Sequence, residues 1–233
     1  MQNVLVTGGA GYVGSHVCKQ LAKSGFRPVA LDNLSRGNSW AIKWGPFEHA
    51  DILDRNHLFS IVAFYQPVAI LHLAALAYVG ESAENPDRYY RNNVVGGINV
   101  LDAAVQSGVQ NFVFSSTCAV YGHPVWLPIT EDHPAKPVNP YGETKLALER
   151  ALNWYQEALG LRSIALRYFN AAGADPELEI GEHHEPETHV IPLITRPRMV
   201  RACETSFTSP TWLRHIFSRC AIFCTADDPK FST

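Results

Sequence analysis

The chain has 233 residues, of which 46% are hydrophobic and 18% are charged, and its formal net charge is −3. These values are typical of a globular protein of one domain or slightly more, and they lack the basic excess of a nucleic-acid-binding domain. No apolar run has the length that crosses a bilayer, and the N-terminus enters a strand pattern without a charged leader, so we expect a cytoplasmic protein. The five cysteines show no C-x-x-C spacing, which predicts free thiols.

A glycine cluster lies between the first strand and the first helix that the sequence predicts. Asn3 to Thr7 is a short apolar run typical of a buried parallel strand, and Ser15 to Ser24 has a helical pattern. The glycines between them are Gly8, Gly11 and Gly14. Their G-x-x-G-x-x-G spacing lets the backbone approach a pyrophosphate at the positive end of the helix. This context predicts a dinucleotide-binding loop.

The second strand, Arg27 to Asp32, ends on a carboxylate about 20 residues after the glycines. A carboxylate at that position accepts hydrogen bonds from the adenosine ribose hydroxyls and repels a 2′-phosphate. Asp32 therefore favours NAD over NADP. Arg36 argues in the other direction, because an arginine just beyond that strand could bind a phosphate.

Further along the chain, strand and helix patterns alternate in the manner of a doubly wound sheet. We expect a Rossmann-like α/β fold with a parallel sheet and helices on both faces. The further strands are expected at 47–50, 69–73, 111–115 and 161–167, and the helices at 54–65, at 86–108 and from 140 onward. Ligands of such sheets bind at the carboxyl ends of the strands. The residues expected there are Asp32, Asp51, Leu73, Ala74, Ser115, Ser116 and Thr117.

The segment Tyr141-Gly-Glu-Thr-Lys145 contains a candidate proton-transfer pair. Pro140 fits the first position of a helix with Asn139 as its cap, so Tyr141 and Lys145 would lie one turn apart on one face. A lysine cation and a cationic nicotinamide would stabilise the tyrosinate and lower the pKa of the phenol, which normally lies near ~10. The alternative is an exposed helix start, which is the commoner meaning of an isolated Tyr-x-x-x-Lys.

Eight motifs in order give the chain a family resemblance. They are T-G-G-A-G-Y-V-G, D-N-L, H-L-A-A, V-G-E-S, N-N-V, F-S-S-T-C-A-V-Y-G, N-P-Y-G-E-T-K and L-R-Y-F-N-A-A-G-A-D-P. From Asn3 to about Ile194 the chain resembles the extended short-chain dehydrogenase/reductases, and within them the UDP-glucose and UDP-arabinose 4-epimerases. Dehydratases of this superfamily usually carry an acidic residue where Cys118 follows Thr117, which argues against dehydration.

The resemblance implies NAD-dependent epimerisation of a UDP-sugar through a 4-keto intermediate. Tyr141 would take the proton of the sugar 4-hydroxyl, Thr117 would bridge the tyrosine and the sugar oxygen, and Lys145 would also bind the nicotinamide ribose. The alternative for Thr117 is a strand-end residue that caps a turn. UDP-glucose and UDP-galactose are the expected pair, with UDP-xylose and UDP-arabinose as an alternative. A non-catalytic NAD-binding module is a second function class.

The resemblance also implies a set of binding residues. The cofactor-binding positions are Gly8, Gly11, Tyr12, Val13, Gly14, Asp32, Asn33, Asp51, Ile52, Leu73, Ala74, Ala75, Asn92, Ser115, Lys145 and Phe169. The substrate-binding positions are Thr117, Asn170, His189 and Val190. Ala77 replaces a lysine that some members place near the phosphates. No metal site is expected, because the His- and Glu-rich segment 181–189 lacks zinc-ligand spacing and contains Pro186. His16 and His72 are expected to be packed or capping histidines.

The expected organisation is an NAD-binding domain at 1–170, the start of a nucleotide-sugar domain at 171–194 and a disordered tail at 195–233. The tail does not match the D-G-T-x-V-R-D-Y-I-H-V-x-D-L-A motif of the family. Read one base out of frame, the codons from Met199 to Leu213 admit D-G-T-C-V-R-D-F-I-H-V-T-D-L-A. We therefore expect an out-of-frame tail on a truncated chain, with impaired activity. A homodimer is expected for the full-length lineage.

Overall fold

The computed structural model describes residues 1–183. Within them, six parallel strands form one sheet in the order β3-β2-β1-β4-β5-β6. The strands are β1 (Asn3–Thr7), β2 (Arg27–Asp32), β3 (Phe47–His49), β4 (Ala69–His72), β5 (Asn111–Thr117) and β6 (Arg162–Tyr168). The order reverses at β1, which pairs with β2 on one side and β4 on the other. This is the doubly wound, Rossmann-like arrangement, and it places a ligand crevice between β1 and β4.

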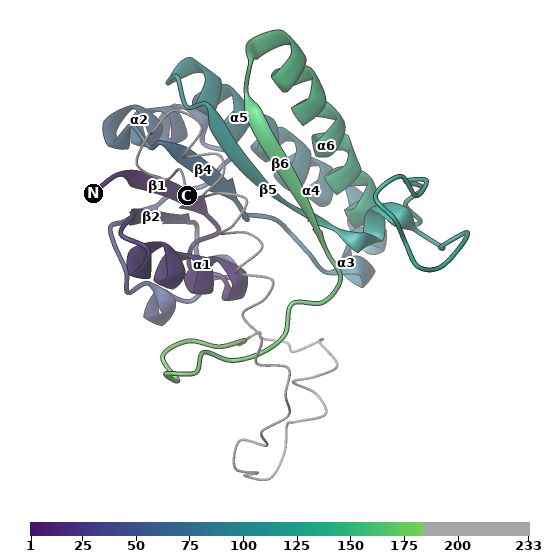
Figure 1. Cartoon of the computed structure of the whole chain (residues 1–233), viewed down its shortest axis with the longest axis horizontal. Coiled ribbons are helices and arrows are strands. Elements are labelled where there is room, and N and C mark those ends of the chain that lie inside the picture. The colour runs from purple at the N-terminus through teal and green to yellow at the C-terminus, as the bar shows by residue number, and fades with distance from the viewer. Residues whose placement is uncertain (184–233) are drawn as a thin grey trace, which may run out of the picture.

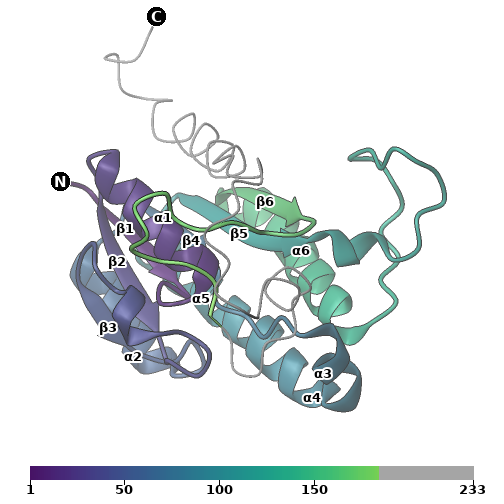
Figure 2. The ribbon, with the colours of Figure 1, turned by 90° about the horizontal axis from the view of Figure 1, so that it is seen from below.

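Helices connect the strands and cover the sheet (Figure 1 and Figure 2). The α-helices are α1 (Tyr12–Lys23), α2 (Arg55–Tyr65), α3 (Val79–Glu84), α4 (Pro86–Tyr89), α5 (Gly96–Gln106) and α6 (Pro140–Leu159). A π-helical segment, Tyr90–Val95, joins α4 to α5, and short 3-10 turns occupy Ser39–Ala41 and Cys118–Tyr121. No helix among residues 1–183 is long and apolar enough to cross a membrane.

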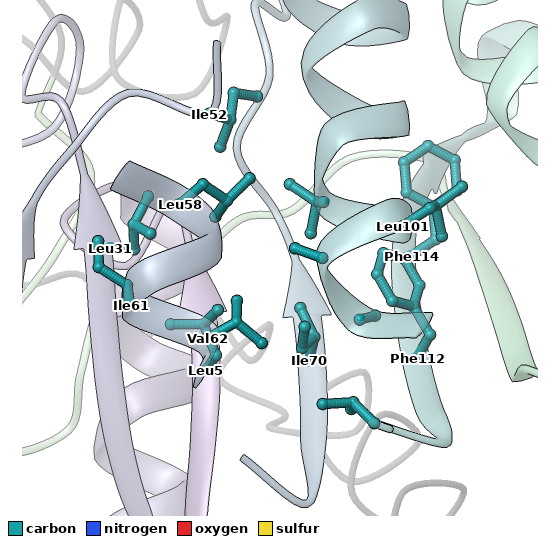
Figure 3. Close-up of a cluster of buried hydrophobic side chains, with 14 of the residues drawn as sticks. Leu5, Leu31, Ile52, Leu58, Ile61, Val62, Ile70, Leu101, Phe112 and Phe114 are labelled. Carbon is teal, nitrogen blue, oxygen red and sulfur yellow. The ribbon is translucent and has the colours of Figure 1, made fainter. Parts of the chain in front are cut away.

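Two hydrophobic clusters pack on opposite faces of the sheet. The first joins alternate strand residues such as Leu5, Ile70 and Phe112 to α2, α5 and α6, and Figure 3 shows these side chains filling the space between sheet and helices. The second joins the intervening strand residues, such as Val6, to α1 through Val17 and its neighbours. Because successive strand residues point to opposite faces, a run that is apolar throughout can supply both clusters.

The expected elements are present, with differences at their ends. β1 and β2 have the expected bounds, and the Asn139 side chain caps α6 by accepting a hydrogen bond from the Gly142 amide at 2.8 Å. The first helix begins at Tyr12 rather than Ser15, because the extended backbone of Gly11 already ends the glycine turn. β5 continues to Thr117, two residues beyond the expected end. The helix expected from residue 86 to 108 contains the π-helical segment, which no local pattern indicates.

The expectations for the tail at 195–233, and for His189 and Val190, lie outside the described residues. The described part of the segment after β6, residues 169–183, turns back beside α1 (Figure 1). The boundary at residue 170 therefore stays a prediction.

Candidate active site

A cavity of about 770 Å³ opens at the carboxyl ends of the strands. It is lined by 18 of the residues that the sequence predicts to bind cofactor or substrate or to act in catalysis: Gly8, Gly11, Tyr12, Val13, Gly14, Asp32, Asn33, Ile52, Leu73, Ala74, Ala75, Asn92, Ser115, Thr117, Tyr141, Lys145, Phe169 and Asn170. Among the predicted residues that lie within the described part of the chain, Asp51 alone does not line it. A single cavity thus joins the glycine turn to the Tyr141 helix, which are more than a hundred residues apart in the sequence.

The glycine turn packs so tightly that two of its glycines are required by the protein itself. Gly8 has a φ of +74°, and a Cβ there would lie 2.7 Å from the Ala74 backbone nitrogen. A Cβ on Gly14 would lie 2.0 Å from the Gly8 carbonyl oxygen. A Cβ on Gly11 would meet only that same oxygen, at 3.2 Å. Gly11 therefore keeps the cavity side of the turn open, while Gly8 and Gly14 hold the turn against β4 and α1.

The N-terminus of α1 lines this cavity and offers hydrogen-bond donors to it. The first-turn amides of a helix have no acceptor inside the helix, and the helix dipole makes this end positive. Gly11, the N-cap, supplies no side-chain acceptor for these amides. The arrangement suits an anionic group such as a pyrophosphate.

Asp32 lies at the end of β2 with its carboxylate fixed by backbone amides. Its oxygens accept hydrogen bonds from Ala10 N at 3.1 Å and Leu34 N at 2.8 Å. Burial raises the pKa of Asp32, and these two hydrogen bonds oppose that effect. A Cβ on Gly37 would lie 2.8 Å from the same carboxylate. A side chain at residue 37 would therefore displace the Asp32 carboxylate from the cavity wall.

Asp51 does not line the cavity but contacts Asn33, which does. Its carboxylate accepts a hydrogen bond from the Asn33 side-chain amide at 2.9 Å and caps the Leu53 amide at 2.8 Å. Asn33, which does line the cavity, is thereby held by Asp51. The polar residue at the end of the third strand acts on the cavity through its neighbour.

Arg36 also lines the cavity, but its charge is paired. One guanidinium nitrogen contacts both carboxylate oxygens of Glu81, at 3.3 and 3.2 Å, and the guanidinium carbon lies 4.9 Å from the Tyr78 ring centroid. Arg88 shares the same carboxylate at 2.6 Å. Because Glu81 partly neutralises Arg36, the arginine is a weaker phosphate ligand than the sequence alone indicates.

Tyr141 and Lys145 lie on one face of α6, at the end of β5. The Lys145 ammonium donates a hydrogen bond to the Ser115 carbonyl at 2.7 Å and lies 5.9 Å from the centroid of the Tyr141 ring. The Thr117 hydroxyl is a hydrogen-bond partner of the Tyr141 phenol and also accepts from the Ala119 amide at 3.1 Å. These contacts bring together the three residues predicted to act in proton transfer.

The Lys145 ammonium is buried in an aromatic and polar environment. It is 3% exposed and lies 4.9 Å from the Phe114 ring centroid. Burial lowers the pKa of Lys145 to about 7, against the opposing charge of Glu149. His72 is 1% exposed, and its ring stacks on the same Phe114 with the ring centroids 5.8 Å apart. Burial and the Lys145 charge lower the pKa of His72 to about 3, so His72 is neutral.

The pKa of Tyr141 is raised in the protein alone, whereas the sequence-based expectation of a lowered pKa includes a cationic nicotinamide. Burial raises the pKa of the phenol, and only the hydrogen bond from Thr117 acts in the lowering direction. The reason lies in the position of Lys145, whose ammonium contacts the Ser115 carbonyl and Phe114 rather than the phenol oxygen. The protein's own charges therefore do not make Tyr141 a tyrosinate, and activation needs a further positive charge in the cavity.

His72 and Thr7 fix the floor of the cavity. The Thr7 hydroxyl is 2.7 Å from His72 Nδ1 and accepts hydrogen bonds from the amides of Leu73 and Ala74, at 3.3 and 3.4 Å. His16 Nδ1 lies 2.8 Å from the Tyr12 carbonyl in the first turns of α1. Both histidines are thus packed, hydrogen-bonded residues, as the sequence predicts.

The π-helical segment supplies two asparagines to the site. Asn93, 2% exposed, accepts from the Leu76 amide at 2.9 Å and donates to the Leu76 carbonyl at 3.0 Å and to Thr144 Oγ1 at 3.1 Å. Asn92, which lines the cavity, donates to Asn93 at 3.0 Å. The extra residue of a π-bulge rotates neighbouring side chains, and such bulges occur frequently at functional sites. Here the segment ties the loop after β4 to α6.

The segment after β6 closes one side of the cavity by contacting α1. The Tyr12 hydroxyl donates to the Gly173 carbonyl at 2.5 Å, and Lys19, 6% exposed in its side chain, contacts the carboxylates of Asp175, Glu177 and Glu179 at 2.5 to 2.7 Å. Those carboxylates also form the one group in residues 1–183 with metal-ligand proximity. The Lys19 ammonium contacts all three carboxylates and Lys23 pairs with Glu177, so these contacts are interpreted as ion pairs that hold the segment against α1.

Several lining residues were not anticipated. They are Leu31, Ser35, Gly37, Ala50, Leu76, Tyr78, Tyr168, Ala171, Ala172 and Glu182. Leu31, Ala50 and Tyr168 lie in or next to expected strands, so the rule that ligands bind at strand ends could have found them. Tyr78 and Glu182 lie in irregular segments, where the sequence carries no comparable signal.

Comparison with known proteins supports the family resemblance that the sequence motifs indicate. Residues 4–205 match the NAD dependent epimerase/dehydratase family. The chain is 56% identical over 191 residues to a UDP-glucose 4-epimerase of Rhizobium meliloti, and 42% identical over 195 residues to a putative UDP-arabinose 4-epimerase of Arabidopsis thaliana. The alignments cover 82% of this chain and 58% of the first relative, and 79% and 47% respectively for the second.

Comparison with solved structures points to the same family. UDP-glucose 4-epimerase from Brucella ovis in complex with NAD superposes with a TM-score of 0.82 at 54% identity, covering 83% of this chain and 59% of that one. The Stenotrophomonas maltophila enzyme, with bound NAD and formylated UDP-arabinopyranose, gives 0.79 at 37% identity, covering 83% and 61%. The chain thus spans 47 to 61% of the length of these relatives. On its sequence match, its sheet and its cavity, the chain belongs to the NAD dependent epimerase/dehydratase family as a homologue of UDP-glucose 4-epimerases.

Proposed function

We propose that the cavity binds NAD and that the chain carries the cofactor-binding and proton-transfer part of a UDP-sugar 4-epimerase. One observation carries the proposal: a dinucleotide-type glycine turn and the Tyr141, Lys145 and Thr117 group line the same cavity. Neither feature alone is specific. Together they supply a place for a dinucleotide and a proton acceptor at a carbon that loses hydride.

The residues present fit NAD. Gly11 leaves the turn open where a side chain would project, and the α1 N-terminus offers amides to a pyrophosphate. Asp32 presents a fixed carboxylate to ribose hydroxyls. The Arg36 charge is shared with Glu81, which weakens the case for a 2′-phosphate ligand. We therefore assign NAD rather than NADP.

NAD, when bound, accepts a hydride from the sugar and returns it. The chain's own residues handle the proton. Tyr141 takes the proton of the sugar 4-hydroxyl, and Thr117 donates a hydrogen bond that stabilises the tyrosinate. The Lys145 ammonium, 5.9 Å from the centroid of the Tyr141 ring, supplies a donor for the nicotinamide ribose and positive charge on the same side of the cavity. Burial lowers the pKa of Lys145, and the negative charge of Glu149 acts in the opposite direction and favours the protonated form.

UDP-glucose and UDP-galactose are the proposed substrate pair. Higher identity to the UDP-glucose 4-epimerase relative, 56% against 42% for the putative UDP-arabinose enzyme, favours it. The UDP-pentose pair is the alternative, since a solved relative named as a UDP-glucose 4-epimerase holds a UDP-arabinopyranose derivative. Thr117 and Asn170 line the cavity and are proposed to contact the sugar nucleotide, together with His189 and Val190. A homodimer is proposed for the full-length lineage.

The short match limits what this chain is proposed to do alone. Binding energy from remote parts of a substrate normally holds the reacting group in place. The alignments cover only 58% of the Rhizobium meliloti relative and 59% of the Brucella ovis structure. We propose that residues 171–194 begin the nucleotide-sugar domain and that the chain as given epimerises UDP-sugars poorly. A module that binds NAD without turnover is the second candidate function. It is favoured by the same observation, that the chain aligns with only part of the length of its relatives.

Recovery of the cofactor tests the assignment. An epimerase cycle regenerates its cofactor, so NAD should stay bound through purification. Purified protein is denatured and the supernatant is assayed enzymatically for NAD and for NADP. We expect NAD in excess, and a Gly11→Leu variant, whose side chain would enter the cavity, should yield none. Recovery mainly of NADP, or no dinucleotide from folded protein even after incubation with NAD, would overturn the assignment.

A further inference from the structure

The last three residues of β5 each contact α6, and the contacts are spaced one helical turn apart. The Thr117 hydroxyl bonds to Tyr141, and the Ser115 carbonyl accepts from Lys145. The Ser116 hydroxyl, between them, donates a short hydrogen bond to Glu149. Residues four apart on a helix share a face, so Tyr141, Lys145 and Glu149 form one row. The proton-transfer pair has a third member in this row that no proposed step uses.

Glu149 is buried and fully engaged. The residue is 8% exposed, and Arg167 on β6 forms a bidentate pair with it, with Nε to Oε1 at 3.0 Å and a terminal nitrogen to Oε2 at 2.6 Å. The Arg167 guanidinium also lies 4.9 Å from the Tyr121 ring centroid. The carboxylate therefore links α6 to both β5 and β6. A buried charge of this kind is costly unless it is paired, and replacing such a pair by apolar residues often stabilises a protein. Fold stability alone is thus a weak reason for this arrangement.

We propose that Glu149 is a positioning residue for the Tyr141 and Lys145 pair: it fixes this face of α6 against β5 and supplies the counter-charge of the Lys145 ammonium. The inference rests on the proposed function only in taking Lys145 as the cation that serves Tyr141. Glu149 itself does not line the cavity and reaches it only through Ser116 and Lys145, so it is not a catalytic residue.

The groups around Lys145 leave Glu149 as its anionic neighbour among the described residues. Tyr141 precedes it on α6, and β5 presents the Ser115 carbonyl and the Phe114 ring. From β4, the neutral His72 faces it. Glu149 alone acts to raise the pKa of Lys145, and Arg167 balances part of that charge. Removing Glu149 should therefore lower the pKa of Lys145, and removing Arg167 should raise it.

Two variants with opposite expected effects test the proposal. The protein is labelled with [ε-13C]lysine, and the Lys145 signal is identified by its loss in Lys145→Met. Its titration is followed by NMR without cofactor or substrate. Glu149→Gln keeps the size of the side chain and removes its charge, so we expect the pKa of Lys145 to fall by about one unit. Arg167→Gln leaves Glu149 unopposed, so we expect a rise.

The opposite signs separate this role from a structural one, because loss of packing alone gives no reason for opposite shifts. Asp102→Asn is the matched control: it breaks the Arg55–Asp102 ion pair at 2.6 Å on α2 and α5, and the Lys145 titration should not change. If Glu149→Gln does not fold, the rise in Arg167→Gln decides the matter. Unchanged Lys145 titration in the folded variants, or shifts of the same sign, would overturn the proposal. Failure to bind NAD would instead count against the proposed function, since this titration needs no cofactor.

Discussion

Replacing Lys145 by methionine should stabilise the cofactor-free protein at neutral and acidic pH. Lys145 is 3% exposed, and burial lowers its pKa from 10.5 in an unfolded chain to about 7. Below pH 7 the folded protein must therefore hold a charge in a site that disfavours it. Methionine has a similar length and no charge, so it removes this cost. The lysine is retained for the chemistry of the cavity rather than for the fold.

The magnitude follows from the shift in pKa. A change from 10.5 to about 7 corresponds to an upper limit of about 5 kcal/mol below pH 7, at ~1.4 kcal/mol for each unit. Losing the hydrogen bond to the Ser115 carbonyl, which spans 2.7 Å, and the contact with Phe114 at 4.9 Å offsets about 2 to 3 kcal/mol. We expect a net gain of about 2 kcal/mol, which raises Tm by ~4 to 8 °C for a domain of this size.

The stability difference between Lys145→Met and the wild type should depend on pH in one direction. Between about pH 7 and 10.5 the unfolded wild type binds more protons at Lys145 than the folded wild type, so its stability rises with pH relative to the variant. The advantage of Lys145→Met should be largest below pH 7 and shrink above it. Thermal unfolding of dinucleotide-free protein at pH 6, 7.5 and 9 measures this, with the exposed Lys136→Met as control. A variant less stable than wild type at pH 6, or a difference independent of pH, would refute the reasoning.

Three further outcomes are expected. Tyr141→Phe, in a chain extended to the full length of its relatives, should lose two to four orders of magnitude in turnover in a UDP-galactose assay while NAD stays bound; near-normal turnover would contradict the proton-acceptor role. Gly14→Ala places a Cβ 2.0 Å from the Gly8 carbonyl oxygen and should destabilise the fold by about 3 kcal/mol or more. Gly11→Ala should fold and bind NAD less tightly. Equal Tm values for the two variants would show that the turn is more adaptable than its packing indicates. Sequencing the coding DNA beyond Ile194 should reveal the family motif in an offset frame, and a stop codon or unrelated residues there would end the frameshift hypothesis.

The sequence alone determined the architecture, because its signals are local. Uninterrupted apolar runs such as Asn3–Thr7 predict strands buried on both faces, and the structure has this strand with the same bounds. The cap of α6 by Asn139 was readable because capping involves neighbouring residues. The glycine spacing and the Tyr141 to Lys145 interval likewise depend on backbone geometry that repeats along the chain.

Tertiary structure decided the electrostatics and the supporting contacts. Pairing of Arg36 with Glu81, 45 residues away, changes an apparent phosphate ligand into a partly neutralised one. The raised pKa of Tyr141 follows from burial and from the ammonium of Lys145 turning toward β5, which no motif specifies. Glu149 and Arg167 come together only when α6 packs on β6. Charges and hydration depend on all neighbours in space, so a pattern along the chain places a catalytic side chain without determining how readily it gains or loses a proton.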